Sequence, residues 1–291
     1  MNAPLVSVLM TAYNREKYIA EAIESVLAQT CTDFELIIVD DCSKDRTVEI
    51  AQRYTKDPRV RVHVNERNLG QFPNRNRSAE LACGQFVKYV DSDDLMYPHG
   101  LEVMVRCIES FPMAGYGLSY DEYYIDGKPY PLQLTPREAY QWHFLRNGLF
   151  GSAPLSAIIR TSAFRSVGGY TGKPHACGDT EFWLIIGARY PVVIMPVGLT
   201  WWRDHDEQED KYEKRTLDYL NERLHIHSSA LESPACPLDE VERNESLRMI
   251  KHAHARAIVG RAARMKISDA LHIFKGSGLT ASQLFLALKR P

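Results

Sequence analysis

The sequence lacks several patterns that would place the chain in a specialised class of protein. Its 291 residues include six cysteines, none of them in a Cys-x-x-Cys pair, which argues against a disulfide framework or a zinc site. The formal net charge is only -2 at pH 7, so no overall basic field points to a nucleic-acid partner. The sequence also contains no internal repeat and no low-complexity tract.

Long uninterrupted apolar runs are missing as well. The first residues carry no basic segment, and the apolar part that follows is too short for a signal peptide. The best candidate for a membrane span, residues 183–202, is interrupted by Arg189, Pro191 and Pro196, so we expect a helix, a turn and a strand there. These absences predict a cytoplasmic protein.

Short apolar runs alternate with helical segments in the first third of the chain. The predicted strands cover residues 5–11, 34–40, 60–64 and 86–90. The first predicted helix carries one apolar stripe, formed by Ile19, Ala22, Ile23, Val26 and Leu27. Ser43 is a candidate cap for the second helix, which should run to Tyr54, and Pro73 suits the first turn of the third. This alternation predicts an α/β fold with a mostly parallel, doubly wound sheet.

Polar residues follow three of these strands at the point where each strand ends. They are Thr11-Ala12-Tyr13-Asn14, Asp40-Asp41 and Asp91-Ser92-Asp93-Asp94. In parallel sheets of this kind, ligands bind beyond the carboxyl ends of the strands. We therefore expect a binding site at this edge.

The Asp91-x-Asp93 pattern points to a metal ion within that site. Three carboxylates in four positions repel one another unless a cation lies among them. Mg²⁺ and Mn²⁺ favour carboxylate oxygens and often bridge the phosphates of a substrate. An acidic turn that only caps the next helix is the plain alternative, and the arrival of Asp40-Asp41 at the same edge argues against it.

Residues 5–98 closely resemble the nucleotide-sugar half of the family 2 glycosyltransferases, which have the GT-A fold. The stretches that carry the resemblance are VSVLMTAYNREKYIAEAIESVLAQT, FELIIVDDCSKDRT and NLGQFPNRNRSAELACGQFVKYVDSDD. A looser similarity continues through SAIIRTSAFRSVGGY and GDTEFW to about residue 206. The resemblance implies a metal-dependent, inverting transferase that uses a UDP-sugar, with a dTDP-sugar as the next choice.

The resemblance also implies roles for individual residues. Thr11, Ala12 and Tyr13 would line the nucleotide pocket, and Asp41 would accept the imide N–H of a uracil or thymine base. Arg75, Asp91 and Ser92 would lie at the nucleotide sugar, with Asp91 at the ribose or the metal. Asp93 would bind Mn²⁺ or Mg²⁺ on the diphosphate. The stretch TWWRDHDEQ resembles a loop that closes over the diphosphate, so Arg203 would contact phosphate and His205 would be a third metal ligand.

Asp179 is the expected catalytic base on the acceptor side. Family members commonly carry Glu-Asp at this point, whereas this chain reads Gly178-Asp179-Thr180-Glu181, so Glu181 stays open as the alternative. Asp179 could instead, or in addition, cap the helix that follows. The histidine pairs at 225/227 and 252/254 are spaced i, i+2, which does not place both side chains on one helix face.

The chain divides on this interpretation into three segments. Residues 1–112 form the nucleotide-sugar half and residues 113–206 the acceptor half, with an Asp126-Gly127 turn and strands near 157–160 and 192–195. Residues 207–291 form a helical extension with a break at 233–237. Its last part is strongly basic with interleaved apolar residues. That composition fits a helical cap or a dimer contact, and it also fits peripheral binding to an anionic membrane, where a lipid-linked acceptor would be found.

Other families explain the acidic motifs less well. A haloacid-dehalogenase-type phosphatase places Asp-x-Asp after its first strand, whereas three β-α units come first here. A phosphate-receiver domain would account for less than half of the chain. A GT-A-like protein that binds a sugar or nucleotide without catalysis is the remaining alternative. The sequence does not define the transferred sugar, the acceptor, the linkage or the oligomeric state.

Overall fold

The computed structural model describes residues 3–120, 128–172, 177–206 and 217–288. Its backbone divides into two compact units, which are described separately. Unit 1 contains residues 1–136, 151–174 and 189–204, and unit 2 contains residues 137–150, 175–188 and 205–291. The roles assigned above to residues 1–112, 113–206 and 207–291 stay predictions.

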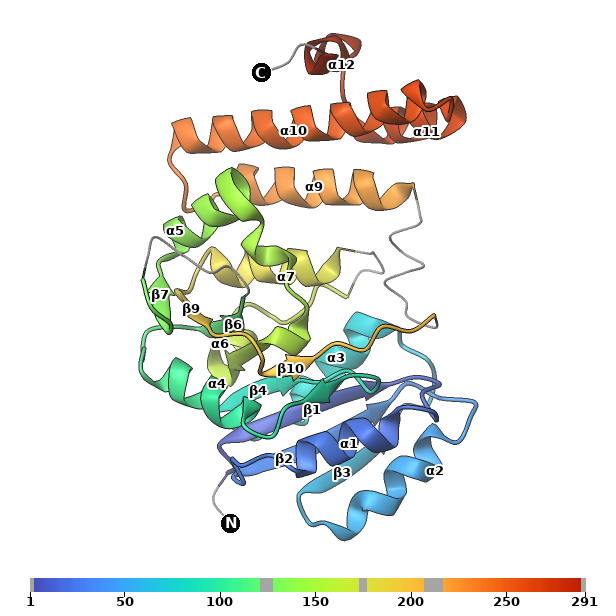
Figure 1. Cartoon of the computed structure of the whole chain (residues 1–291), viewed down its shortest axis with the longest axis vertical. Helices are drawn as coiled ribbons and strands as arrows, with labels where there is room; N and C mark the ends of the chain where they lie inside the picture. Colours follow the sequence, from blue (N-terminus) through green and yellow to red (C-terminus); the bar gives the residue numbers. More distant parts are fainter. Residues whose placement is uncertain (1–2, 121–127, 173–176, 207–216, 289–291) are drawn as a thin grey trace. The chain divides into compact units, whose positions relative to one another are not determined.

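Unit 1 is built on an eight-stranded sheet with the order β3-β2-β1-β4-β8-β6-β9-β7 (Figure 1). The first four strands are parallel: β1 (Val6–Ala12), β2 (Phe34–Asp40), β3 (Val60–Val64) and β4 (Phe86–Tyr89). The strands of the second half are β6 (Tyr116–Ser119), β7 (Leu132–Leu134), β8 (Ala157–Arg160) and β9 (Val192–Met195). Of these, β7 and β8 run antiparallel to their neighbours. The mostly parallel α/β sheet is therefore confirmed.

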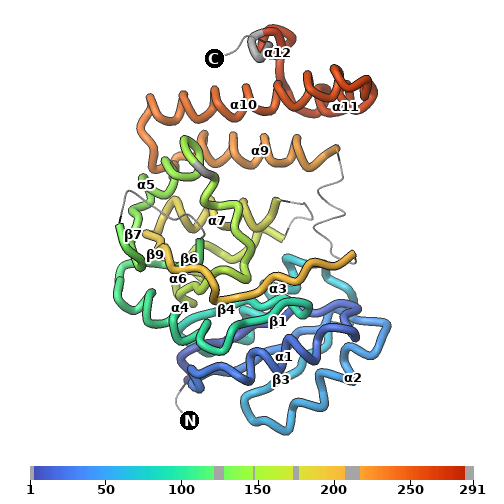
Figure 2. Tube along the Cα trace, viewed as in Figure 1, coloured from blue at the N-terminus to red at the C-terminus, as the bar shows by residue number. Residues whose placement is uncertain are grey.

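Helices of unit 1 lie between its strands along the chain, and those that connect β1, β2, β3 and β4 were predicted from the sequence (Figure 2). They are α1 (Ile19–Leu27), α2 (Thr47–Gln52) followed by the 3₁₀ turn η1 (Arg53–Lys56), α3 (Gln71–Glu80), α4 (Gly100–Glu109) and α6 (Thr161–Ser166). The apolar stripe of α1 is buried in the core together with side chains of β1 and β2. These packed helices and strands leave the residues after β1, β2 and β4 at one edge of the sheet.

The predicted cap of α2 is wrong. The helix begins at Thr47 with Arg46 as its N-cap, and the Asp45 carboxylate accepts a hydrogen bond from the Thr47 N–H at 2.9 Å. Ser43 instead donates its hydroxyl to Asp40 and accepts the Asn14 N–H at 2.8 Å. Ser43 therefore joins the ends of β1 and β2 instead of starting a helix.

A small second sheet lies in the same unit. Strand β5 (Leu95–Met96) pairs antiparallel with β10 (Thr200–Trp201). The pairing brings the segment after residue 201 beside the acidic turn that precedes β5. Two segments that are about a hundred residues apart in the sequence therefore lie side by side.

Unit 2 is helical. It contains α5 (Pro136–Gln141), the π-helical turn η2 (Trp142–Asn147) and α7 (Gly178–Gly187). The chain then forms α9 (Asp218–Glu232), α10 (Glu240–Ala263), α11 (Ile267–Ser277) and α12 (Ala281–Leu288). Short 3₁₀ turns, η3 (Leu149–Gly151) and η4 (Pro154–Ser156), precede β8. The predicted break at 233–237 is confirmed, and further breaks follow Ala263 and Ser277.

Two other expectations concern residues 120–202. The proposed turn at Asp126-Gly127 lies outside the described residues. The run at 183–202 forms the end of α7, a turn, β9 and β10, as predicted. Among the residues described, no helix is both long and apolar enough to cross a membrane.

Candidate functional site

An acidic turn follows β4 at the carboxyl edge of the sheet. The Asp94 N–H donates to the Asp91 carbonyl at 3.0 Å and closes the turn. Asp94 and Ser92 are buried, whereas Asp91 and Asp93 are partly accessible. Burial, followed by the neighbouring charge of Asp91, raises the pKa of Asp94 to about 8. Burial and the charge of Asp91 therefore disfavour the ionised form of Asp94, and a nearby cation would stabilise that form.

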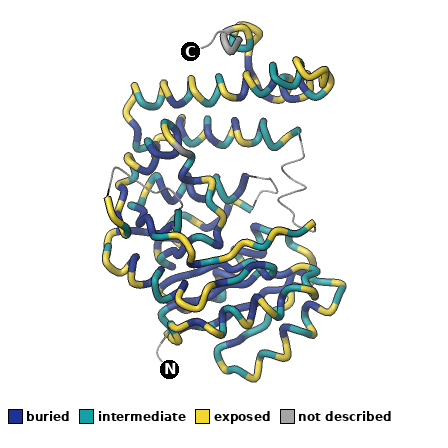
Figure 3. Tube along the Cα trace, in the orientation of Figure 1, coloured by how far each residue is buried: buried dark blue, intermediate teal, exposed yellow. Residues whose placement is uncertain are grey.

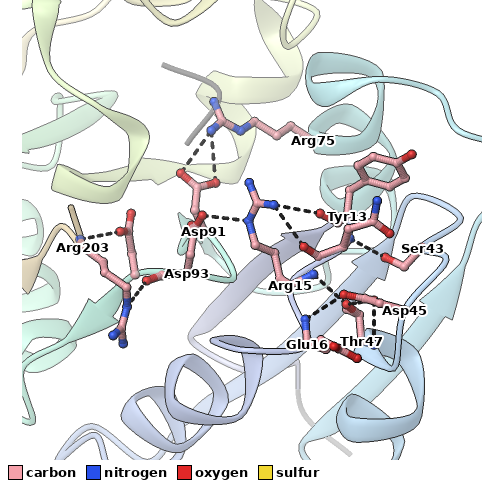
Figure 4. A network of polar contacts seen from close by, with 12 residues as sticks. Tyr13, Arg15, Glu16, Ser43, Asp45, Thr47, Arg75, Asp91, Asp93 and Arg203 are labelled. Carbon is pink, nitrogen blue, oxygen red and sulfur yellow. Dashed lines mark hydrogen bonds and ion pairs between the residues drawn. The ribbon is translucent and has the colours of Figure 1, made fainter. Parts of the chain in front are cut away.

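Arg15 supplies one such cation, and the sequence analysis did not single it out. Its Nε donates to Oδ2 of Asp93 at 2.9 Å, and its Nη1 donates to the carbonyls of Tyr13 and Asn14 at 3.2 Å and 3.1 Å (Figure 4). Asn14 has a left-handed φ of 53°, a conformation that Asn tolerates better than most residues. The signal in the sequence was a basic residue just after the polar end of β1.

Arg75 supplies a second cation from α3. Its guanidinium is 2% exposed, and one nitrogen donates to both carboxylate oxygens of Asp91 at 3.1 Å and 3.3 Å. Three aromatic rings surround the guanidinium, with ring centroids at 5.7 Å for Tyr170, 5.9 Å for Phe72 and 6.0 Å for Tyr89. Aromatic faces favour a cation at this distance. The cage therefore holds Arg75 in place and fixes the orientation of Asp91.

Arg203 reaches the same turn from the segment after β10. Its main-chain N–H donates to Oδ1 of Asp94 at 2.9 Å, and its Nε donates to the Asp93 carbonyl at 2.8 Å. The guanidinium lies 5.1 Å from the ring centroids of Tyr18 and Trp201. Three arginines from three different parts of the chain thus converge on one acidic turn, as Figure 4 shows.

Asp41 lies at the end of β2 but is engaged with the protein itself. It is 3% exposed and accepts hydrogen bonds at 2.8 Å from Asn65 Nδ2, the Leu69 N–H and the Gly70 N–H. A carboxylate has about four acceptor positions, so three of them are used here. Contact of Asp41 with a nucleotide base stays a prediction, and the structure gives Asp41 a second task, which is to hold the 65–70 segment.

The remaining strand-end residues lie as expected along β1. Thr11 and Ala12 end the strand, and Tyr13 follows it with its side chain 43% exposed. Ala12 pairs in register with Asp40 of the neighbouring strand. The predicted nucleotide residues of β1 and the acidic turn after β4 therefore share one edge of the sheet, while their contacts with a nucleotide stay predictions.

Lys88 is an unexpected buried cation in β4. Its side chain is 0% exposed, and its Nζ donates to the carbonyls of Tyr89, at 3.0 Å, and Leu155. Burial lowers the pKa of Lys88 to about 7, and the charges of Asp91 and Asp94 oppose this shift. The sequence showed Lys88 inside an apolar run, which is the only signal that marked it.

Asp179, Glu181 and His205 belong to unit 2, whereas the acidic turn belongs to unit 1. The helix α7 begins at Gly178 with Cys177 as its N-cap, so the alternative that Asp179 caps the helix is wrong. Asp179 and Glu181 both lie in the first turn of α7. The roles of these three residues stay predictions.

Unit 2 also contains a buried histidine pair that the spacing argument overlooked. Nε2 of His143 lies 3.0 Å from Nε2 of His227, and Nδ1 of His143 accepts the Phe150 N–H at 3.0 Å. Because that nitrogen accepts, the neutral His143 carries its proton on Nε2 and donates it to His227. Burial lowers the pKa of His227 to about 4 and that of His143 well below its usual value. His227 of α9 therefore contacts η2 through His143. The i, i+2 spacing of His225 and His227 does not predict this contact.

The residues of the acidic turn fit a divalent cation by their chemistry. Asp91 and Asp93 present carboxylate oxygens at a partly accessible edge, and these are the ligands that Mg²⁺ and Mn²⁺ prefer. Burial is the main cause of the raised pKa of Asp94, and the charges of Asp91 and Asp93 add to it; a further cation would offset this repulsion. Within the described ranges, no three His, Cys, Asp or Glu side chains are grouped as a preformed metal site. Metal binding at these residues therefore stays a prediction.

Comparison with known proteins identifies relatives of this chain. The sequence model described as glycosyl transferase family 2 matches residues 7–168. An uncharacterized glycosyltransferase from Methanocaldococcus jannaschii is 32% identical over 190 residues, which are 63% of this chain and 65% of that protein. The matched region spans 48% to 66% of the length of the first curated relatives.

Solved structures share the fold. The structure of S. aureus TarS 1-349 in complex with UDP-GlcNAc matches with a TM-score of 0.71 and 21% identity, over 93% of this chain and 79% of TarS 1-349. The mannosyltransferase PcManGT from Pyrobaculum calidifontis, in complex with GDP-Man and Mn²⁺, matches with a TM-score of 0.64 and 16% identity, over 99% of this chain and 84% of PcManGT. These likenesses confirm the predicted GT-A type fold.

Proposed function

The chain belongs to glycosyl transferase family 2, and we propose that it moves a sugar from a nucleoside-diphosphate sugar to a hydroxyl group of a glycan or lipid-linked acceptor. A UDP-sugar is the favoured donor and a dTDP-sugar the next choice. The observation that carries the proposal is the acidic turn Asp91–Asp94, held among three arginines at the carboxyl edge of a parallel sheet. Ligands of such sheets bind at this edge. The structural relative TarS, which binds UDP-GlcNAc, supports the choice of donor.

The donor side of the reaction is assigned to residues of unit 1 and to His205, which belongs to unit 2. Asp93 and Asp91, with His205 as a third ligand, would hold Mn²⁺ or Mg²⁺. When bound, the metal neutralises charge that develops on the departing diphosphate. The guanidinium groups of Arg203 and Arg15 add positive charge near the same position. The Mn²⁺ bound by the structural relative PcManGT supports the use of a divalent cation.

The acceptor side is assigned to Asp179, with Glu181 as the alternative. The Asp179 carboxylate removes the proton from the acceptor hydroxyl while the hydroxyl oxygen attacks the anomeric carbon. The bond from that carbon to the diphosphate oxygen breaks in the same step, and the nucleoside diphosphate leaves. A single displacement of this kind inverts the anomeric centre.

A nucleotide-sugar panel tests the proposal directly. The protein is incubated with UDP-, dTDP- and GDP-sugars, with Mn²⁺, with Mg²⁺ or with EDTA, and release of nucleoside diphosphate is measured. We expect release with at least one UDP-sugar, loss of release in EDTA and recovery with added Mn²⁺. Full turnover in EDTA would contradict the metal assignment. Tight binding of a nucleotide sugar without release, across a range of acceptors, would favour a binding protein that lacks catalysis.

A further inference from the structure

Helix α11 in unit 2 carries both buried and exposed apolar side chains. The inner face buries Ala270 and Ile273 in a core shared with α9 and α10. The outer face carries Ile267, Leu271 and Lys275, which are spaced four residues apart and are all exposed. Residues four apart lie on the same side of a helix. The outer face is thus a stripe of two apolar side chains that ends in a lysine.

The turn between α10 and α11 extends this stripe. Met265 is 84% exposed and has a left-handed φ of 61°, which is uncommon for a residue other than Gly, Asn or Asp. Arg264 and Lys266 flank it, and both are exposed. Figure 3 shows exposed residues gathered at this end of α10 and α11. Met265, Ile267 and Leu271, with Arg264, Lys266 and Lys275, form what we call the corner patch.

The part of the sequence that contains the corner patch is rich in basic residues. Between residues 247 and 288 one acidic residue, Asp269, stands against seven basic ones: Arg248, Lys251, Arg256, Arg261, Arg264, Lys266 and Lys275. On the packed helix α9, Oδ1 of Asp218 accepts a hydrogen bond from His272 of α11 at 2.7 Å. Exposed apolar side chains with basic residues around them are the combination that an anionic lipid surface attracts.

We propose that the corner patch docks this protein on an anionic membrane surface. Met265, Ile267 and Leu271 would enter the boundary between the headgroups and the acyl chains. Lys and Arg side chains can extend their charged ends towards lipid phosphates while their aliphatic parts stay against apolar surface. A second copy of the chain fits this patch poorly, because a symmetric dimer would bring two sets of basic residues together. The proposal depends on the surface of α10 and α11 and not on the proposed glycosyl transfer.

Vesicle sedimentation tests the proposal with the full chain. The protein is mixed with vesicles of phosphatidylcholine alone or of phosphatidylcholine with phosphatidylglycerol, and the pelleted fraction is measured. We expect binding to the anionic vesicles, weak binding to the neutral ones, and release as salt rises, since surface charges are screened within roughly 10 Å at 0.1 M salt. Equal binding to both kinds of vesicle, or to neither, would overturn the proposal.

Two sets of variants locate the contact. The triple variant Met265→Ser, Ile267→Ser, Leu271→Ser removes the apolar part, and the triple variant Arg264→Gln, Lys266→Gln, Lys275→Gln removes the charge. Each basic residue near a membrane surface contributes about fivefold to partitioning, so the second set should weaken binding by roughly 100-fold. Because all six side chains are exposed, both variants should keep the far-UV circular dichroism and the unfolding midpoint of the parent chain.

Matched controls carry the same changes elsewhere. Met113→Ser alters a side chain that is 78% exposed in unit 1, and Arg53→Gln removes an exposed guanidinium from η1. Neither should change vesicle binding. The proposal fails if these controls lower binding as much as the corner-patch variants do. It also fails if the serine variant leaves vesicle binding intact and instead converts a dimer to a monomer in analytical ultracentrifugation, because the patch would then be an interface between copies.

Discussion

Nε of Arg15 donates a hydrogen bond to Oδ2 of Asp93 at 2.9 Å, which joins the loop after β1 to the acidic turn after β4. The two residues are 78 positions apart in the sequence. A divalent cation that binds Asp93 therefore competes with a guanidinium for the same oxygen. This competition gives a direct way to test the metal assignment.

Substitution of Arg15 should strengthen the binding of Mn²⁺. In Arg15→Gln the positive charge beside Asp93 is lost, and a unit charge at a few Å contributes about 1–4 kcal/mol near a protein surface. We expect Mn²⁺ affinity to rise on the order of tenfold, measured by titration calorimetry, whereas Asp93→Asn should remove the site. Arg46→Gln is the matched control, because Arg46 is an exposed guanidinium in the same unit that pairs with Glu16 at 3.3 Å. Weaker Mn²⁺ binding in Arg15→Gln would show that Arg15 supports the site instead of competing for it.

Asp179→Asn should abolish turnover and leave the fold intact. Loss of a general base typically costs on the order of 10²- to 10⁴-fold in rate. The KM for the donor should barely change, because Asp179 is not among the residues assigned to donor contacts. Glu181→Gln is a close control, since both acids lie in the first turn of α7 and each loses about 0.3–1 kcal/mol of favourable interaction with the helix dipole. Initial rates with a saturating acceptor decide the assignment. The roles are reversed if Glu181→Gln stops turnover and Asp179→Asn does not.

Lys88→Met should change how stability depends on pH. The pKa of Lys88 is lowered to about 7 in the folded chain from 10.5, so between these values the unfolded chain binds more protons than the folded one. The parent chain should therefore gain stability relative to Lys88→Met as the pH rises through this window, by at most about 1.4 kcal/mol for each pH unit. Urea unfolding between pH 6 and about 9 measures the difference. Lys56→Met, at an exposed position in η1, controls for the loss of a charge. Parallel stability curves for Lys88→Met and the parent would show that Lys88 is not buried as described.

His227→Gln should protect unit 2 from acid. The pKa of His227 is lowered to about 4 from 6.5, so the unfolded chain binds the extra proton first as the pH falls. The parent chain should lose stability from about pH 6.5 to pH 4 by at most about 1.4 kcal/mol per unit for this group, and the variant should lose less. Because the readout is the slope against pH, a constant loss of stability from the substitution does not disturb it. His252→Gln serves as the control on α10. An unchanged slope in His227→Gln would contradict the assignment of the buried pair.

Most strands and helices of unit 1 could be predicted, because the apolar patterns that indicate them are formed by neighbouring residues. Continuous apolar runs such as Phe34–Asp40 predict strands buried on both faces, and the structure places them side by side in the parallel half of the sheet. The polar residues that follow them fall at one edge by the geometry of parallel strands. Ser43 was predicted as the cap of α2 from its residue type, but its hydroxyl accepts the Asn14 N–H at the end of β1, a contact that the local sequence does not indicate.

The sequence by itself determined the fold class, the family and the position of the acidic turn, because apolar periodicity and strand-end motifs are properties of neighbouring residues. The tertiary structure decided which positively charged side chains contact that turn. Arg15, Arg75 and Arg203 come from the loop after β1, from α3 and from the segment after β10, and the sequence analysis did not predict that they pair with the acidic turn. It also decided that Lys88 and His227 are buried, since burial depends on what packs against a side chain. Charges and hydrogen bonds act through space, so their partners and their pKa values depend on distances that only the folded chain defines.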